Sequence, residues 1–104
     1  SFPAFLAPEQ MWVIPVSDNH AEYAKKVHQE LLENSFRSIL RDDNETVSKK
    51  IRQGELQKIP YLLVVGDREI ESDSVSPRYK GEDLGETKLT DFIKKVKIEV
   101  EEEK

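Results

Sequence analysis

Apolar runs and one alternating stretch predict four strands. Residues 11–16, 36–40 and 60–66 predict three of them, and the continuous apolar run of the third is typical of a central strand covered on both faces. Pro15 has no amide hydrogen to donate, so we expect the first strand to lie near a sheet edge or to be interrupted there. Residues 75–80 alternate between apolar and polar, which predicts a half-buried fourth strand.

Apolar residues at helical spacing predict three helices. The first carries Ala21, Ala24, Val27, Leu31 and Leu32. Asn19 and Glu22 resemble a capping box at its start, and Asn34 is expected as a left-handed cap at its end. The second helix lies within 46–56, where Gly54 costs about 1 kcal/mol relative to alanine. The third carries Leu89, Phe92, Ile93, Val96 and Val100.

The order of these elements predicts an α/β fold. The chain reads β-α-β-α-β-β-α, with a loop or short strand at 80–86, and this order implies a mixed sheet with helices packed on it. Pro77 moves the fourth strand towards an edge of that sheet. A length of 104 residues suits one compact domain. Residues 1–10 contain two prolines and are expected to form an extended lead-in.

Composition excludes several classes of protein. Hydrophobic residues make up 37% of the chain, and no apolar run approaches the about 20 residues that a membrane span requires. The N-terminus lacks the basic and apolar regions of a signal peptide. Because the chain has no cysteine, disulfides and thiolate zinc sites are excluded, which fits a reducing compartment.

The charge distribution changes the picture that the total charge gives. The net charge of −5 argues against a general nucleic-acid binder, which usually has a basic surface. Residues 37–80, however, carry a net charge of +1, and the remainder carries −6. An anion site in the middle of the chain would therefore be local and built from individual residues.

The residue patterns reveal no catalytic group. His20 and His28 are eight residues apart, whereas a helical metal pair prefers a spacing of three or four. Glycine-rich phosphate motifs and a G-x-S-x-G motif are absent. Asp42 and Asp43 are most simply turn residues before a helix. Patterns alone therefore predict a soluble α/β binding module.

Three segments together closely resemble one family. They read FPAFLAP, DNETVSKKIRQGELQKIPYLLVVGDREIES and VSPRYKGEDLGE. In this order they resemble the C-terminal anticodon-binding domain of bacterial-type threonyl-tRNA synthetases, and the resemblance spans nearly the whole chain. It implies a mixed, mainly five-stranded sheet with three helices, residues 1–10 as a linker from the catalytic core, and residues 11–104 as the domain. The implied function is binding of the anticodon of threonine tRNA.

The resemblance also implies the residues that contact the anticodon. They are Asn44, Glu69 and Arg78, with Lys50 and Arg52 as candidates for contacts with the RNA backbone. A carboxylate such as Glu69 accepts hydrogen bonds from guanine N1–H and its N2 amino group. The guanidinium of Arg78 grips a base carbonyl or a phosphate in two places. Asn44 offers the donor and the acceptor that a uracil edge requires.

We expect the turn after 60–66 to bring the chain out of the core and to present Glu69 at the rim of the sheet. Other roles stay open for these residues. Asn44 is also placed to cap the second helix, and Glu69 and Arg78 to form a surface ion pair of little energy. Lys49, Lys50 and Arg52 also fit an ordinary solvated helix face.

The chain departs from the family pattern at five positions. They are Asp43, Thr46, Ser48, Lys49 and Pro77. Asp43 stands where the family usually has arginine, so a repelling charge replaces a phosphate partner. We expect this change to weaken affinity more than selectivity, because phosphate contacts set strength and base contacts set selectivity.

The resemblance places the remaining chemistry outside this chain. The intact enzyme would be an ATP-dependent ligase with a catalytic zinc, acting as a cytoplasmic homodimer, and neither group is expected to bind here. The expected partners are threonine tRNA and the rest of the synthetase, without a membrane. Three alternatives are a free-standing nucleic-acid-binding domain without anticodon preference, a flavodoxin-like domain and a dimerising module. Residues 15–20 contain no glycine, which argues against the flavodoxin-like alternative.

Overall fold

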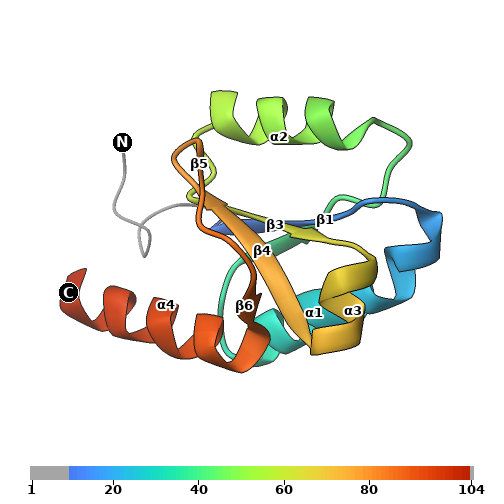
Figure 1. The fold of residues 1–104 in the computed structure, drawn as a ribbon. Helices are drawn as coiled ribbons and strands as arrows, with labels where there is room; N and C mark the ends of the chain where they lie inside the picture. The colour runs from blue at the N-terminus through green and yellow to red at the C-terminus, as the bar shows by residue number, and fades with distance from the viewer. Residues whose placement is uncertain (1–9, 104) are drawn as a thin grey trace.

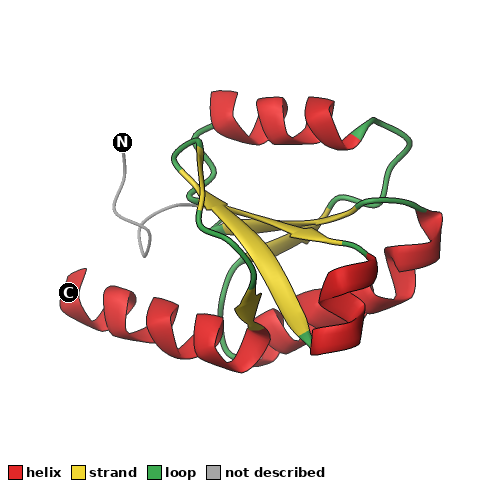
Figure 2. Ribbon diagram, in the orientation of Figure 1, coloured by secondary structure: helices red, strands yellow, loops and turns green. Residues whose placement is uncertain are grey.

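The structure, a computed structural model, describes residues 10–103. Within them the sheet has six strands in the order β2-β1-β3-β4-β5, with β6 also paired to β4 (Figures 1 and 2). The strands are β1 (Met11–Pro15), β2 (Ser38–Leu40), β3 (Tyr61–Val65), β4 (Ser74–Tyr79), β5 (Glu82–Asp83) and β6 (Thr87–Lys88). The helices are α1 (Ala21–Glu33), α2 (Val47–Leu56), α3 (Asp67–Ser72) and α4 (Leu89–Glu103), with a short 3-10 turn η2 (Asp18–His20).

The sheet is mixed. β1 runs parallel to β2 and β3, whereas β4 runs antiparallel to β3 and pairs with β5 and β6. The carboxyl ends of the three parallel strands therefore meet at one edge, and β4 begins at that same edge. The connections after β1, β2 and β3 and the start of β4 become neighbours there.

Helices cover the two faces of the sheet unequally. Figure 1 shows α2 alone on one face, with α1 and α4 on the other. On the α2 face, Trp12, Ile14 and Leu62 pack with the partly buried Val47, Ile51 and Ile59. The opposite face holds the larger core. Its members are Met11, Val13, Ala24, Val27, Leu31, Phe36, Tyr61, Leu63, Val65, Val75, Leu89, Phe92, Ile93 and Val96.

Gly54 lets α2 approach the sheet closely. A Cβ at this position would lie 2.4 Å from Cδ2 of Leu62, which is closer than carbon atoms pack. Gly54, which the sequence marks as a weak helix former, is therefore the residue at which α2 contacts β3. This contact fixes the height of α2 above the sheet.

The predicted fold class is confirmed, with several local differences. β1 lies beside the edge strand β2 and ends at Pro15, so the expectation of a strand near an edge or interrupted there is confirmed. Pro77 lies in β4 between the residues that pair with β6 and those that pair with β5, so neither of these strands needs its missing amide hydrogen. The sheet has one strand more than expected within the described residues.

The prediction of three helices missed α3. This six-residue helix begins directly after Gly66, where a turn was expected. Its sequence DREIES holds a single apolar residue, so it has no helical apolar period to detect.

Two predicted helix caps are wrong. The backbone N–H of Ser17 donates to Nδ1 of His20, so the capping interaction before α1 involves these residues rather than Asn19 and Glu22. Asn34 is the C-cap of α1 but has φ −94°, and the next residue, Ser35, takes the left-handed conformation with φ 67°.

The apolar stripes of the long helices are confirmed. Ala24, Val27 and Leu31 of α1 are fully buried, although Leu32 is exposed. The expected lead-in, residues 1–10, lies outside the described residues except for Gln10. Gln10 is tied to the sheet, because its backbone bonds to Arg37 and Tyr61.

Candidate functional site

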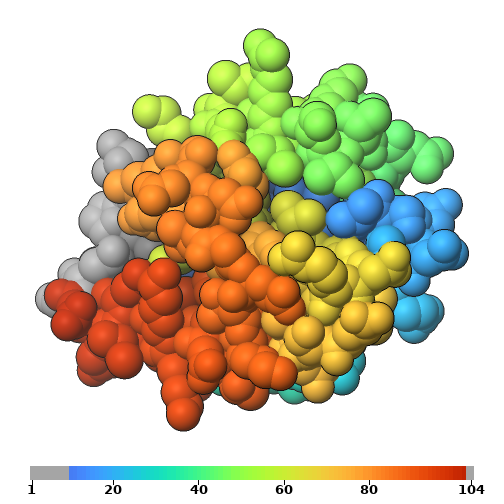
Figure 3. All heavy atoms as spheres, viewed as in Figure 1, coloured from blue at the N-terminus to red at the C-terminus, as the bar shows by residue number. Residues whose placement is uncertain are grey.

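Two pockets lie at opposite ends of α2. The larger, about 430 Å³, is lined by residues at the C-terminal end of α2 and by the β4–β5 turn, and includes Glu55 and Arg78. A smaller one, about 260 Å³, lies between the β1–α1 and β2–α2 connections and includes Asn44 and Lys50. Figure 3 shows the face on which α2 (green), β4 and β5 (orange) and the β3–α3 segment (yellow) adjoin.

Asn44 lies in the connection between β2 and α2, at the edge where the parallel strands end. Its side chain is exposed and makes no hydrogen bond within residues 10–103. The N-cap of α2 is Thr46, whose hydroxyl accepts from the N–H of Lys49, so Asn44 does not cap the helix. The side-chain amide of Asn44 is therefore free to form hydrogen bonds with a ligand.

Arg41 organises this connection. Its Nε and Nη2 donate to the two carboxylate oxygens of Asp43 at 2.9 and 3.2 Å, and Nη2 also donates to Gln53 of α2 at 2.8 Å. The guanidinium lies 4.4 Å from the ring centroid of Trp12, within range of a cation–π contact. These hydrogen bonds lower the pKa of Asp43 to about 2. Asp43 is therefore an ion-paired carboxylate rather than a bare repelling charge.

The two candidate backbone contacts lie in different environments. Lys50 is only 3% exposed, and its Nζ donates to the carbonyl oxygen of Arg41 at 2.7 Å. To reach a phosphate, the ammonium group of Lys50 would have to break this hydrogen bond to Arg41. Arg52 is exposed on α2. The structure thus separates a buried lysine from an accessible arginine.

Glu69 is not presented at the rim, and that expectation is wrong. The residue is 7% exposed at the third position of α3. Its Oε1 accepts from the backbone N–H of Gly66 and its Oε2 from the hydroxyl of Ser76, both at 2.7 Å. The carboxylate therefore caps the N-terminal end of α3 and links α3 to β4. Each carboxylate oxygen has a hydrogen-bond partner, which offsets part of the cost of burying this group.

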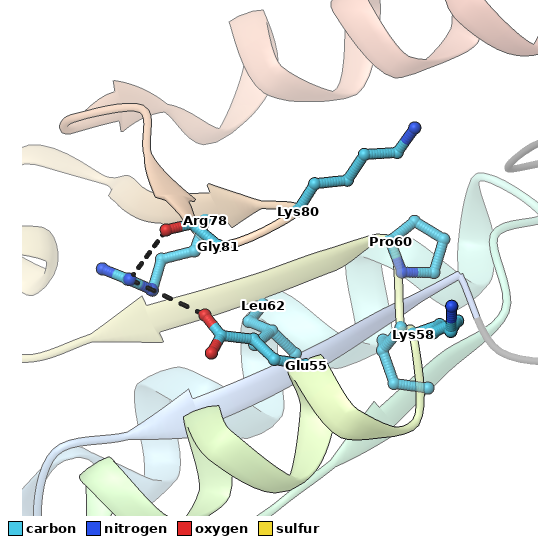
Figure 4. Close-up of a pocket in the computed structure, with 8 residues that line it drawn as sticks. Glu55, Lys58, Pro60, Leu62, Arg78, Lys80 and Gly81 are labelled. Atoms are coloured by element: carbon cyan, nitrogen blue, oxygen red, sulfur yellow. Dashed lines mark hydrogen bonds and ion pairs between the residues drawn. The ribbon is translucent and has the colours of Figure 1, made fainter. Parts of the chain in front are cut away.

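Arg78 lies on β4, in the larger pocket. Its Nη2 lies 3.7 Å from Oε2 of Glu55 and donates to the carbonyl oxygen of Gly81 at 3.3 Å (Figure 4). Its Nε is buried without a hydrogen-bond partner in the part of the chain that the structure describes. The open alternative of a Glu69–Arg78 ion pair is wrong, because Arg78 pairs with Glu55.

The structure spreads the predicted residues along α2 rather than into one cavity. Glu69 reaches Ser76, and Arg78 is two residues further along β4 on the same face of the sheet. Asn44 lies before the N-terminal end of α2, whereas Arg78 lies beside its C-terminal end. Ten residues of helix span about 15 Å, a separation that suits an unstacked single strand rather than one small ligand.

Sequence reasoning missed Glu55 and Arg41. The polar turn and the helix that contain them were both predicted, yet charged residues at such positions are usually solvated. Only the packing of α2 over the sheet shows that Glu55 faces Arg78 and that Arg41 faces Trp12. Spacing in the sequence carries no signal for either contact.

The two histidines have structural partners. Nε2 of His20 lies 2.7 Å from Oδ1 of Asp67, and Nδ1 of His28 lies 2.8 Å from the hydroxyl of Ser38. No three His, Asp or Glu side chains in residues 10–103 are arranged to hold a metal ion. Across those same residues, none of the helices combines the length and apolar character needed to cross a membrane.

Comparison with known sequences gives a consistent family. Residues 10–99 match the family described as anticodon binding domain. The chain is 48% identical over 101 residues to a threonine–tRNA ligase of Caldanaerobacter subterraneus subsp. tengcongensis, covering 96% of this chain and 16% of that protein. It is 45% identical over 105 residues to a threonine–tRNA ligase of Carboxydothermus hydrogenoformans, covering 100% of this chain and 17% of that protein. The chain thus spans about a sixth of the length of these relatives.

Comparison with solved structures gives the same fold. The RNA-binding domain of threonyl-tRNA synthetase from Cryptosporidium parvum superposes with a TM-score of 0.83 at 31% identity, covering 90% of this chain and 24% of that one. Prolyl-tRNA synthetase of the same organism also has a TM-score of 0.83, at 23% identity, covering 97% of this chain and 22% of that one. The second likeness shows the shared fold alone. The first agrees with the resemblance found in the sequence.

Proposed function

The chain belongs to the family of anticodon-binding domains, and we propose that it binds the anticodon loop of threonine tRNA as part of a threonine–tRNA ligase. The match over residues 10–99 carries this proposal. The identities of 48% and 45% to threonine–tRNA ligases support the choice of threonine tRNA. In such an enzyme the domain would help to select the tRNA, and threonylation would take place elsewhere.

The geometry supports RNA bases as the ligand. Asn44 and Arg78 carry unused hydrogen-bonding groups at the two ends of α2. Unstacked anticodon bases expose the edges that such side chains bind. Arg52 supplies an accessible cation between the two ends, on the exposed side of the helix.

Glu69 and Lys50 belong to the proposed site in a different way from that expected. In this structure both hold the site together from within, Glu69 through Gly66 and Ser76, and Lys50 through Arg41. A direct contact between either residue and RNA would require one of these bonds to open. We therefore assign them first to positioning of the two connections.

The remaining expectations concern the larger protein. ATP and zinc would bind in the rest of the ligase rather than in this chain. The rest of the ligase would be a partner of the domain, the full protein would act as a homodimer, and translation would place it in the cytoplasm.

The proposal predicts base-dependent binding of an anticodon stem-loop. Titration of the ¹⁵N-labelled chain with the threonine-tRNA stem-loop should shift amide signals around Asn44, Glu69 and Arg78. Changing the middle guanine of the loop to adenine should weaken these shifts. Arg78→Lys keeps the charge but removes the two-pronged guanidinium, so it should lower affinity about fivefold or more.

Two outcomes would contradict the proposal. Equal binding of both loops would indicate a nucleic-acid-binding domain without anticodon preference. The absence of shifts with either loop would contradict binding by this chain itself. Lys25→Arg provides a charge-conserving control, since Lys25 is exposed on α1, which covers the face of the sheet opposite α2 (Figure 1).

A further inference from the structure

The guanidinium of Arg41 is held in one orientation by its neighbours. It lies 4.4 Å from the ring centroid of Trp12, which is itself only 3% exposed, and its Nη2 donates to Oε1 of Gln53 at 2.8 Å. The backbone of the residue is fixed as well. Its N–H donates to the carbonyl oxygen of Val13 at 2.8 Å, and its carbonyl oxygen accepts from Nζ of Lys50 at 2.7 Å. A guanidinium held in this way is pre-organised for a planar contact with two acceptor oxygens.

The carboxylate of Asp43 occupies that two-oxygen position. Its Oδ1 accepts from Nε of Arg41 at 2.9 Å, and its Oδ2 accepts from Nη2 at 3.2 Å. These hydrogen bonds lower the pKa of Asp43 to about 2, so the group is ionised at neutral pH. The side chain of Asp43 is 46% exposed, whereas that of Arg41 is 16% exposed. The pair is therefore open to solvent on the side of the carboxylate.

A phosphate can replace a carboxylate as the ligand of an arginine. Both groups present two oxygen atoms that match the fork of the guanidinium. Arg41 is fixed by the packing of its ring face and by its backbone, whereas Asp43 lies in an exposed connection. An exchange of ligands would therefore move the carboxylate into water and leave the guanidinium in place. A phosphate arriving from solvent would then accept from Nε and Nη2.

The pair lies next to a residue already proposed to bind RNA. Asp43 directly precedes Asn44 in the connection that leads to the N-terminal end of α2 (Figure 1). Since consecutive Cα atoms are about 3.8 Å apart, the carboxylate of Asp43 and the amide of Asn44 belong to one small region of the surface. Every nucleotide carries its own phosphate, so a base that binds Asn44 would bring a phosphate close to Arg41.

We propose that Arg41 binds a backbone phosphate of the RNA and that Asp43 masks this guanidinium in the free domain. This inference deepens the proposed function and rests on it. Asp43 acts as a tethered competitor, because the phosphate binds only those molecules in which the ion pair is open. Ion pairs with an exposed partner favour the closed state by a factor of about 2 to 5, so masking lowers the affinity for RNA by a similar factor.

Asp43→Asn tests the masking directly. Fluorescence anisotropy would give the affinity of the 104-residue chain for the threonine-tRNA stem-loop at several KCl concentrations. The variant keeps the size of the side chain and removes the charged competitor, so the affinity should rise about threefold. One added phosphate contact to a single strand should also steepen the plot of log K against log salt concentration by about 0.7.

Asp42→Asn is the matched control. Asp42 is the neighbouring residue, is exposed, and forms no ion pair within residues 10–103. Its substitution removes the same charge without unmasking Arg41. Because salt screens exposed charges, the affinity should rise less than about 1.5-fold. The salt slope should not change, because no phosphate contact is added.

Two measurements show whether the gain depends on the guanidinium. In an Arg41→Gln background, Asp43→Asn should raise the affinity no more than Asp42→Asn does. Because Arg41 also packs on Trp12, the second measurement leaves residue 41 unchanged. It follows the Nε–H signal of Arg41 in ¹⁵N spectra of Asp43→Asn. This signal should shift as the stem-loop is added and should saturate with the affinity measured by anisotropy.

The outcomes separate this inference from the proposed function. Equal gains from Asp43→Asn and Asp42→Asn would overturn the inference, since charge repulsion alone would then explain both. A gain that survives Arg41→Gln, or an Arg41 signal that does not move, would overturn it too. A loss of affinity in Asp43→Asn would show that the pair positions Asn44 instead. All of these results leave base-dependent binding intact, whereas a chain that binds the stem-loop no better than an unrelated RNA hairpin refutes both proposals.

Discussion

Two side chains hold the start of β4 in place. The hydroxyl of Tyr23, on α1, donates to the carbonyl oxygen of Ser74 at 2.7 Å. The carboxylate of Glu69, on α3, accepts from the hydroxyl of Ser76. Because Arg78 lies two residues beyond Ser76, these bonds also determine where its guanidinium can reach. Tyr23 and Glu69 thus contribute to the geometry around Arg78.

Tyr23 should make the stability of the domain sensitive to alkaline pH. Burial, followed by the nearby carboxylate of Asp73, raises the pKa of Tyr23 to about 12, from an ordinary value of about 10. Because the folded pKa is raised, this stabilisation is fully present below about pH 10 and is lost as the pH rises towards 12. Tyr23→Phe should remove that loss.

Urea unfolding at a series of pH values would measure the effect. At neutral pH, Tyr23→Phe should cost about 1 kcal/mol of unfolding free energy, because the carbonyl of Ser74 loses its donor. Above pH 10, the difference between the two proteins should shrink. Parallel pH curves for both proteins would show that Tyr23 does not cause the alkaline loss.

At the scale of elements, α2 links the core to the site. One side of the helix packs on Trp12, Ile14 and Leu62, while its two ends border the two pockets. The close approach of Gly54 to Leu62 sets the distance from helix to sheet. A change in that distance would also move Glu55, the next residue, relative to Arg78.

Gly54→Ala should destabilise the domain although alanine is the better helix former. The gain in helix propensity is about 1 kcal/mol. The new Cβ would meet Leu62 at 2.4 Å, and overpacking of this kind costs about 1–3 kcal/mol. We expect a net loss of about 1 kcal/mol in the free energy of unfolding, measured by urea denaturation.

Ser48→Ala is the matched control on the same helix. Ser48 is exposed, so alanine there should leave stability unchanged or raise it by about 0.5 kcal/mol. An equal gain from both substitutions would mean that α2 does not depend on a close contact at Gly54.

At the scale of the whole molecule, the proposed binding of RNA would have to overcome an unfavourable net charge. The chain carries −5, and acidic residues also border the smaller pocket near Asn44. Part of that acidity is neutralised, since Asp43 is held by Arg41. If the domain binds RNA as proposed, we expect the affinity to come mainly from base contacts and from a few accessible cations, including Arg52 and Lys58.

This balance predicts a shallow salt dependence of RNA binding. Two or three phosphate contacts to a single strand give a slope of about −2 in a plot of log K against log salt concentration. Anisotropy titrations of the stem-loop across a range of KCl concentrations would measure the slope. A slope of about −4 or steeper would show that phosphates dominate and that base reading contributes little.

The sequence by itself determined the elements whose apolar periods are long. The stripes of α1 and α4 and the continuous run of β3 are each readable because burial on one or both faces imposes a period. The motifs around Asn44, Glu69 and Arg78 also identified the family. Short elements such as α3 gave no comparable signal, because six residues with one apolar side chain have no measurable period.

Only the tertiary structure decided which charged groups are free. Glu69 and Glu55 are alike in sequence, each a glutamate in a polar stretch, yet one is bonded at both oxygens and the other faces a pocket. Ser76 reaches Glu69 because β4 turns back beside β3, and Arg78 reaches Glu55 because α2 crosses the same face. Contacts between residues distant in the chain depend on strand pairing and helix packing, which local spacing does not encode.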